Sequence, residues 1–448
     1  MLLRFGTANH LSIRDYQELS LTATALKDPV DGLLQLTPGH EGGIAAVPVV
    51  ALYGANASGK STILRALDFF VNAIRISHTG TSARTGTPHD PFLLDDYSRN
   101  NPSRYDADFV IEGIRYHYGF ELDGEIINSE WLFSFPPEHQ RQSRTILFHR
   151  DATEEEQFHF GKSLKGDNKR ISKLTRDNSL FLSAAAQNAH PILSNIYDFF
   201  HLGFSRRFDN IADENSMNKQ LFAYFSQDEE QRNRAMSFLK AADIGIANIK
   251  FKKKPLGEKT KLLIQEFETI FSKHSEFKDL SIGDTLSSTE TEIFHSGENS
   301  QPYPIKLEGE SSGTKALLQL LGPVLRRLQF GGVLVVDELN IALHPLVSHE
   351  IIKLFSDPKT NPGGAQLIFT THDTSMLTTG LLRRDQIWFV EKDTDGSTCI
   401  YALSSIKIRR SDDFEKGYIE GRFGAIPMFG LGEHEYQKIG SLFEKVEG

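Results

Sequence analysis

The residues with the clearest chemistry lie between Gly54 and Ser61, where the sequence reads Gly-Ala-Asn-Ala-Ser-Gly-Lys-Ser. This is the complete GxxxxGK[ST] pattern of a phosphate-binding loop. Its glycines let the backbone wrap around phosphate oxygens, its lysine reaches the β- and γ-phosphates, and its last hydroxyl binds Mg²⁺. The predicted ligand is therefore a nucleoside triphosphate. The predicted binding residues are Gly54, Asn56, Ala57, Ser58, Gly59, Lys60, Ser61 and Thr62, and Ser61 is also a predicted Mg²⁺ ligand.

The elements that must position this loop occur in the required order. Residues 47–53 form an apolar, β-branched run typical of a buried strand, and residues 62–73 carry apolar side chains at helical spacing. A glycine turn in front of an ordinary helix is the alternative interpretation. Because a strand, the loop and a helix follow one another, the sequence favours nucleotide binding.

Two carboxylates, Asp337 and Glu338, follow the apolar run Val333–Val336. Parallel strands deliver the residues that follow them to one edge of a sheet, so we expect these acids beside the phosphate-binding loop. Asp337 is the predicted Mg²⁺ ligand, and Glu338 is the predicted general base for the attacking water. A buried strand that simply ends in a charged turn is the alternative.

Three more polar segments are candidates for the same site. Ser311–Lys315 opens an apolar helix predicted at 316–328, and such a helix start presents free N–H groups to an anion. Ser-Ser-Gly is also a common N-cap, so this segment alone is a weak signal. An apolar strand predicted from Gln366 ends at His372. Gln187 follows an apolar run and is either a glutamine of the site or a helix cap.

These motifs and their order resemble the ABC-type ATPase head domains of the SMC, Rad50 and RecF group. The resemblance implies ATP and Mg²⁺ as cofactors. It implies Ser311 and Gly313 as signature residues that cap the nucleotide of a second copy, and His372 as a switch histidine at the γ-phosphate. Ser312 and Glu310 depart from the family pattern, where glycine and leucine are usual. The predicted catalytic residues are Glu338, His372 and Lys60.

Five further segments resemble the AAA15/AbiL-RloA ATPases of prokaryotic defence loci. They are Phe5–Ile13, Pro91–Leu94, Glu310–Thr314, Leu343–Pro345 and Gly417–Pro427. The resemblance implies an ATP-dependent sensor or regulator of a separately encoded toxin or nuclease, TOPRIM nucleases among them, in anti-phage defence. It also implies a homodimer or higher homo-oligomer. The alternative is a RecF/Rad50-like DNA-binding ATPase in DNA repair.

Composition narrows the class of protein. At 448 residues with 39% hydrophobic and 24% charged residues, the chain is typical of a globular protein with a large core. Its single cysteine, Cys399, excludes an intrachain disulfide framework. Its apolar runs are too short for a membrane helix, and a net charge of −10 disfavours nonspecific nucleic-acid binding over the whole surface. We therefore predict a cytoplasmic protein without a membrane partner, which also disfavours a transporter head.

The predicted fold class is α/β: an ABC-type P-loop ATPase head with an antiparallel β subdomain and a compact inserted helical arm. The predicted units are ATPase lobe I (1–187), a helical insert (188–300) and ATPase lobe II (301–448). Alternation predicts half-buried strands at 11–13 and 19–21, and two-residue turns at 112–113 and 123–124 predict hairpins linking strands at 108–111, 115–122 and 125–133. Helical segments are predicted at 191–200, 219–225 and 230–241.

Two surface features leave alternatives open. The first is the basic cluster Lys250–Lys254 with Lys259 and Lys261, which either binds a nucleic-acid backbone or is a solvated face. The second is the apolar and aromatic segment Phe414–Phe429, which either docks a partner or packs on its own head. In the docking interpretation, the predicted anchors are Tyr418, Arg422 and Phe423.

Overall fold

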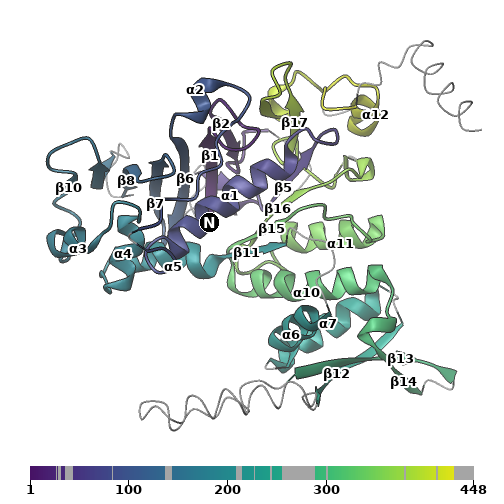
Figure 1. Cartoon of the computed structure of the whole chain (residues 1–448). Helices are drawn as coiled ribbons and strands as arrows, with labels where there is room; N and C mark the ends of the chain where they lie inside the picture. The colour runs from purple at the N-terminus through teal and green to yellow at the C-terminus, as the bar shows by residue number, and fades with distance from the viewer. Residues whose placement is uncertain are drawn as a thin grey trace, which may run out of the picture.

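The computed structural model describes residues 1–26, 28, 32–35, 44–82, 84–136, 144–207, 214–226, 228–242, 245–254, 288–298, 301–377, 380–409 and 412–427. Two large sheets and one small sheet organise these residues, with helices packed between and around them (Figure 1). Lys259, Lys261, Met428 and Phe429 lie outside the described residues.

A six-stranded sheet forms the centre of the molecule. Its order is β11 (Phe204–Arg207), β15 (Val333–Val336), β16 (Gln366–Thr370), β5 (Val49–Tyr53), β17 (Ile387–Lys392) and β18 (Thr398–Ala402). The first five strands are parallel, and β18 runs antiparallel to β17. All residues of β5, β15 and β16 are buried, as expected for strands covered on both faces.

Helices cover both faces of this sheet. Alternate residues of β5 point to opposite cores: Val50 and Leu52 pack with α1 (Lys60–Ile76), whereas Val49 and Ala51 pack with α10 (Ser312–Phe330). Two further helices, α11 (Pro345–Ser356) and α12 (Phe414–Ile419), pack on the α10 face. Figure 1 shows α1 on one side of β5, β16 and β15, with α11 and α10 on the other.

A seven-stranded antiparallel sheet packs against α1. Its order is β10 (Phe158–Phe160), β9 (Thr145–Asp151), β8 (Ile127–Phe135), β7 (Ile114–Leu122), β6 (Ser103–Ile111), β1 (Leu2–Ala8) and β2 (Gln17–Ser20). Both predicted strand pairings are confirmed. Glu112 and Gly113 form the predicted two-residue turn and both have positive φ, whereas four residues, 123–126, join β7 to β8 in place of the predicted two. The strand predicted at 11–13 is wrong: these residues form a turn closed by paired hydrogen bonds between His10 and Ile13.

The inserted region contains more than helices. Helices α6 (Glu214–Phe225) and α7 (Glu229–Ala241) match the prediction, but a three-stranded antiparallel sheet accompanies them: β12 (Ile246–Lys254), β13 (Ser288–Ser296) and β14 (Pro302–Lys306). Helix α5 (Leu193–Gly203) instead packs in the core beside α1, and β11 pairs with β15. Residues 193–207, which lie within the predicted insert (188–300), therefore pack with α1 and the central sheet.

The remaining described elements are short. They are β3 (Leu34–Gln35), β4 (Ala45–Ala46), α2 (Asp96–Arg99), α3 (Asn168–Leu174), α4 (Phe181–Gln187), η3 (Leu307–Gly309), η4 (Thr374–Leu377) and η5 (Leu403–Ser405).

The C-terminal segment packs on its own head. Tyr418 and Phe423 are only 8% and 4% exposed, and both rings stack on Phe389 of β17. The Tyr418 hydroxyl also donates to the Ala425 carbonyl at 3.0 Å. The prediction that Tyr418 and Phe423 anchor a partner is therefore wrong. Burying these aromatic faces against β17 stabilises the head, and it leaves Arg422 as the exposed member of the predicted trio.

Candidate functional site

The phosphate-binding loop follows β5 and leads directly into α1, and its two pattern glycines are sterically required. A Cβ on Gly54 would collide with the Val390 carbonyl, and a Cβ on Gly59 would collide with the Thr398 hydroxyl. Gly59 also has a φ of 106°, in the left-handed region that glycine adopts without strain. The loop therefore follows a close-fitting path past β17 and β18, with backbone N–H groups at the start of α1 available to an anion.

Lys60 is folded back over the loop. Its ammonium donates to the carbonyls of Gly54 and Ala55, both at 2.9 Å, and the residue is 6% exposed. Burial lowers the pKa of Lys60, and the nearby carboxylates of Glu338 and Asp337 act in the opposite direction. The lysine and both acids therefore share one electrostatic environment, although they come from distant parts of the sequence.

Hydroxyl groups that sequence analysis did not single out support the loop from outside. The Thr398 hydroxyl of β18 donates to the Ser58 carbonyl at 3.0 Å. The Ser12 hydroxyl lies 3.1 Å from that of Thr62 and 2.8 Å from that of Thr398. The turn at 11–13 thus supports the nucleotide loop. Among the described residues, the buried Ser58 hydroxyl has no hydrogen-bond partner, which leaves it available to a ligand.

Asp337 and Glu338 follow β15 and are held by the neighbouring strand. The Thr370 hydroxyl, at the end of β16, donates to Asp337 Oδ1 at 2.5 Å and accepts the Glu338 N–H at 2.7 Å. Glu338 has a φ of 54°, a left-handed conformation that costs a non-glycine residue about 1–3 kcal/mol. Thr370 therefore helps to hold a strained backbone at the predicted general base. A threonine that ends a buried strand is an ordinary feature, so the sequence alone gives no signal for this role.

His372 lies just beyond β16, which is hydrogen-bonded between β15 and β5. Its side chain is exposed at this edge of the sheet. Loss of hydration lowers the pKa of His372, as does the Lys60 ammonium, whereas Glu338 and Asp337 act to raise it. The structure thus brings Lys60, Asp337, Glu338 and His372 together at the carboxyl edge of the parallel strands.

The predicted signature residues lie elsewhere on the same chain. Ser311 is the N-cap of α10, where its hydroxyl accepts the Thr314 N–H at 3.0 Å. A Cβ on Gly313 would lie 2.8 Å from the Ala342 carbonyl, so this position packs tightly against the segment that follows Glu338. Throughout the described parts of the chain, no hydrogen bond joins Ser311 or Gly313 to residues 54–62. Within one copy, Gly313 thus packs against Ala342.

Gln187 is not at this site. It ends α4 and hydrogen-bonds the Tyr197 side chain, whose hydroxyl donates at 2.9 Å to the carbonyl of Arg75. Arg75 lies in the last turn of α1, and this helix of 17 residues spans about 25 Å. Gln187 therefore lies near the end of α1 farthest from the phosphate-binding loop.

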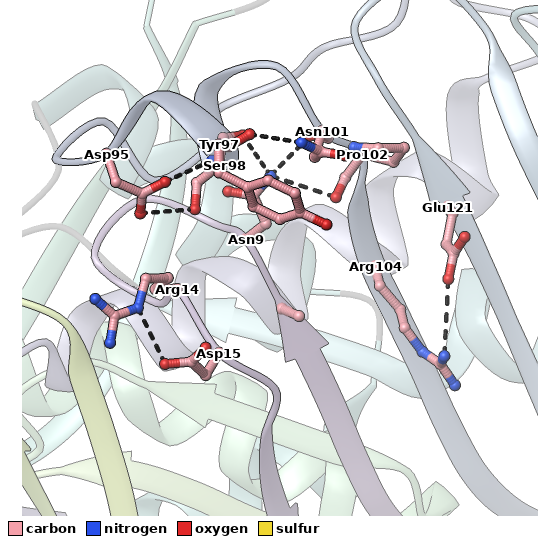
Figure 2. A pocket seen from close by; sticks show the side chains of 11 residues that line it. Asn9, Arg14, Asp15, Asp95, Tyr97, Ser98, Asn101, Pro102, Arg104 and Glu121 are labelled. Carbon is pink, nitrogen blue, oxygen red and sulfur yellow. Dashed lines mark hydrogen bonds and ion pairs between the residues drawn. The ribbon is translucent and has the colours of Figure 1, made fainter.

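A pocket of about 580 Å³ lies beside the turn that carries Ser12, and it is shown in Figure 2. Asn9 organises its rim: the amide nitrogen donates to the carbonyls of Ser98 and Asn101 at 2.8 and 2.7 Å, and its oxygen accepts the Phe92 N–H at 2.9 Å. The N-terminal segment singled out by sequence thus holds the loop at 92–102. None of the predicted site residues lines this pocket.

Two lysines of the basic cluster in β12 have partners on the neighbouring strand. Lys252 forms an ion pair with Glu292 at 2.6 Å, and the Lys250 ammonium lies 4.7 Å from the centre of the Phe294 ring. Both partners belong to the adjacent strand β13. Within the helices that the structure describes, none has the length and apolar composition needed to cross a bilayer.

Comparison with known proteins gives one family match. Residues 49–378 match the AAA_21 family model, described as "AAA domain, putative AbiEii toxin, Type IV TA system". The matched range runs from β5 to residues just beyond His372, so it contains every predicted site residue. No protein with a curated description matches the chain.

Three solved structures show distant likeness. The first is an SMC head bound to the C-winged helix domain of ScpA, with 14% identity and a TM-score of 0.38, and the match covers 91% of this chain and 99% of that one. The second is an SMC head domain from Thermotoga maritima, with 13% identity, a TM-score of 0.39 and coverage of 91% and 99%. The third is an Smc head domain with an extended coiled coil bound to the C-terminal domain of ScpA, derived from Pyrococcus furiosus, with 13% identity, a TM-score of 0.36 and coverage of 94% and 98%. At these TM-scores, the likeness carries no inference about function.

Proposed function

The chain belongs to this family of AAA domains and has a mixed α/β fold, and from this premise we propose that it binds and hydrolyses Mg²⁺-ATP at residues 54–62. The proposal rests on one observation: four polar side chains lie close together at one edge of the parallel sheet. They are Lys60, Asp337, Glu338 and His372. These four groups supply a cation for phosphate, a metal-binding carboxylate, a base and a polar sensor.

The residues present fit the nucleotide and its metal. Positions 54 and 59 exclude a Cβ, so the backbone keeps the close path that a phosphate cradle needs. The Ser61 hydroxyl and the Asp337 carboxylate are oxygen ligands of the kind that Mg²⁺ prefers. Lys60 would exchange its two backbone carbonyl partners for phosphate oxygens. When bound, Mg²⁺ would neutralise part of the negative charge on the phosphates.

Glu338 is the proposed general base. The backbone of Glu338 is held at a φ of 54°, and its N–H donates to the Thr370 hydroxyl. These two features fix the backbone position from which the Glu338 side chain extends. The same threonine donates to Asp337, so the proposed base and the proposed metal ligand are held by one side chain. This shared support keeps the distance between the two acids constant while Glu338 positions and deprotonates the attacking water.

We further propose that two copies complete one site. Ser311 caps α10 and Gly313 lies in its first turn, on the sheet face opposite to α1, so a second copy would have to present them to the nucleotide. The free N–H groups at the start of α10 suit a phosphate. Loss of the γ-phosphate would then weaken the contact between copies, which makes assembly depend on the nucleotide state.

The proposed biological role is ATP-dependent control of a separately encoded toxin or nuclease in anti-phage defence. The family description, which names a toxin of a type IV toxin–antitoxin system, supports this setting. The resemblance to AAA15/AbiL-RloA ATPases supports a regulator that works with a second protein. The alternative role in DNA repair gains no support from β12, since Lys252 is already paired with an acid.

The test combines hydrolysis with control of the partner. Purified protein should bind Mg²⁺-ATP in calorimetry and release phosphate, and Lys60→Ala should do neither. The protein encoded by the neighbouring open reading frame is then co-expressed with wild type or with Lys60→Ala. Toxicity or nuclease activity should respond to wild type only. ATP-dependent cleavage of nucleic acid by the purified chain alone would contradict the two-protein proposal.

A further inference from the structure

His372 depends on its backbone for its position. Within the described chain, no side chain donates a hydrogen bond to its imidazole or accepts one from it, although it shares the electrostatic environment of Lys60. The position of the His372 backbone is therefore set by the residues on either side. Any group that fixes residues 371–375 also controls where the imidazole can reach.

Four elements hold this segment. On the N-terminal side, the Thr371 hydroxyl donates to Asn340 at 2.9 Å and accepts the Asp373 N–H at 3.0 Å. On the β5 side, the Tyr53 hydroxyl donates to the Asp373 carbonyl at 3.3 Å. From α11, His349 Nε2 lies 3.2 Å from the Ser375 hydroxyl. The fourth contact comes from the C-terminal helix.

That fourth contact is a hydrogen bond from the Thr374 hydroxyl to Glu415 Oε1 at 2.8 Å. Glu415 is half-buried in the first turn of α12, two residues after the Asp413 N-cap. It is a hydrogen bond to a carboxylate, the stronger class of side-chain hydrogen bond. It joins a residue two positions after His372 to a helix more than forty residues further along the chain.

Helix α12 does not need this bond to stay in place. Its Phe414 and Tyr418 are buried, and Tyr418 packs both on Phe389 and on Tyr53, the last residue of β5 before the loop. The Asp413 side chain caps the helix by accepting the Lys416 N–H at 2.9 Å. The Glu415 carboxylate is therefore free to act on Thr374 from a helix that is already anchored.

We propose that Glu415 is a positioning residue that holds His372 in its working place through Thr374. The proposal rests on the ATPase function proposed above and adds a residue to which neither the family description nor the motifs give a role. Because Glu415 touches no nucleotide-binding residue, its loss should slow turnover without weakening the binding of ATP.

The experiment compares kcat and KM for ATP in five variants of the full chain. Glu415→Ala removes the acceptor, and Thr374→Val removes the donor; each should lower kcat roughly fivefold to twentyfold with KM within about twofold. Glu415→Gln and Thr374→Ser keep the hydrogen bond and should stay near wild type. Glu420→Ala is the matched control, because Glu420 is an exposed acid at the end of α12.

A second arm separates positioning from simple stabilisation. In a His372→Ala background, Glu415→Ala should cause no further loss of kcat, because both changes remove the same contribution. An additive loss, a raised KM, or a Glu415→Ala variant that turns over like wild type would overturn the proposal.

A third arm does not depend on hydrolysis. With selectively labelled histidine, the imidazole resonance that disappears in His372→Ala should shift in Glu415→Ala and stay unshifted in Glu415→Gln. An unshifted resonance in Glu415→Ala would overturn the positioning role. Absence of hydrolysis by wild type would instead contradict the proposed function, while this resonance still decides the inference about Glu415.

Discussion

Replacing Thr370 with valine tests how the two acids of the site are held. Valine keeps the volume and β-branching of threonine in β16, so the substitution removes only the hydroxyl group. That hydroxyl donates to Asp337 at 2.5 Å and accepts the Glu338 N–H at 2.7 Å. Thr370 is fully buried, so water cannot easily replace it.

The expected cost follows from these two bonds. Losing a donor to a carboxylate costs about 1.5–3 kcal/mol, and leaving a buried N–H without an acceptor costs about 1–3 kcal/mol. Because the two acids are half-buried and can relax toward water, we expect the free energy of unfolding to fall by about 3 kcal/mol. With Glu338 released from its position, kcat for ATP should fall about 10- to 100-fold, part of the loss expected from removing a general base.

Denaturant unfolding and steady-state phosphate release measure the two effects. Thr370→Ser retains the hydroxyl and is the matched control, so it should stay close to wild type in both assays. A Thr370→Val protein with wild-type kcat would refute the idea that Thr370 holds the proposed base. A fall in stability without any fall in kcat would limit Thr370 to a structural role.

Five other changes test separate parts of the molecule. Lys60→Ala should abolish ATP binding in calorimetry, whereas Glu338→Gln should keep binding but slow turnover about 10²- to 10⁴-fold in a phosphate-release assay; wild-type turnover would refute the base assignment. Gly313→Asp should fail to hydrolyse ATP, and mixing it with Lys60→Ala should restore one site per mixed dimer; no recovery in a demonstrated mixed dimer would contradict the shared site. Burial lowers the pKa of His10 to about 4, so the unfolded state binds more protons between pH 6.5 and 4. Stability should therefore fall as the pH falls through this window, and His10→Gln should lose that component when unfolding is followed against pH. Tyr418→Ala should lower the free energy of unfolding by about 3–5 kcal/mol, because its ring is buried against β17, and urea titration would reveal an unchanged midpoint if the segment were only loosely attached.

Local sequence patterns were sufficient for the elements that carry the predicted site. The apolar run at 333–336 is observed as β15 with the same bounds, and the helix predicted from residue 62 is observed as α1. These predictions succeeded because a buried parallel strand and an amphipathic helix each leave a strong periodic signal. The turn at 11–13 was missed because three residues with alternating polarity fit a strand and a tight turn equally well.

The small sheet of the insert shows a second limit of prediction from local sequence patterns. Strand β12 contains the lysine-rich stretch, and Lys252 finds its ion-pair partner, Glu292, on β13, about forty residues later in the chain. A run of lysines gives no local signal for a strand whose stabilising acids are distant. The same limit applies to the C-terminal aromatics, whose apolar character indicated burial but not the surface that would bury them.

The sequence by itself determined the chemistry of the proposed nucleotide site: the glycines, lysine and hydroxyl of residues 54–61, and the two acids after a buried strand, are set by residue type and spacing. Only the tertiary structure decided what holds them. Thr370 and Glu415 act through partners that are 33 and 41 residues away, and Thr398 acts on Ser58 across 340 residues. A hydrogen bond depends on distance in space. The pairing of β16 and β18 within the central sheet and the packing of α12 against that sheet create those distances, so no local pattern could have indicated them.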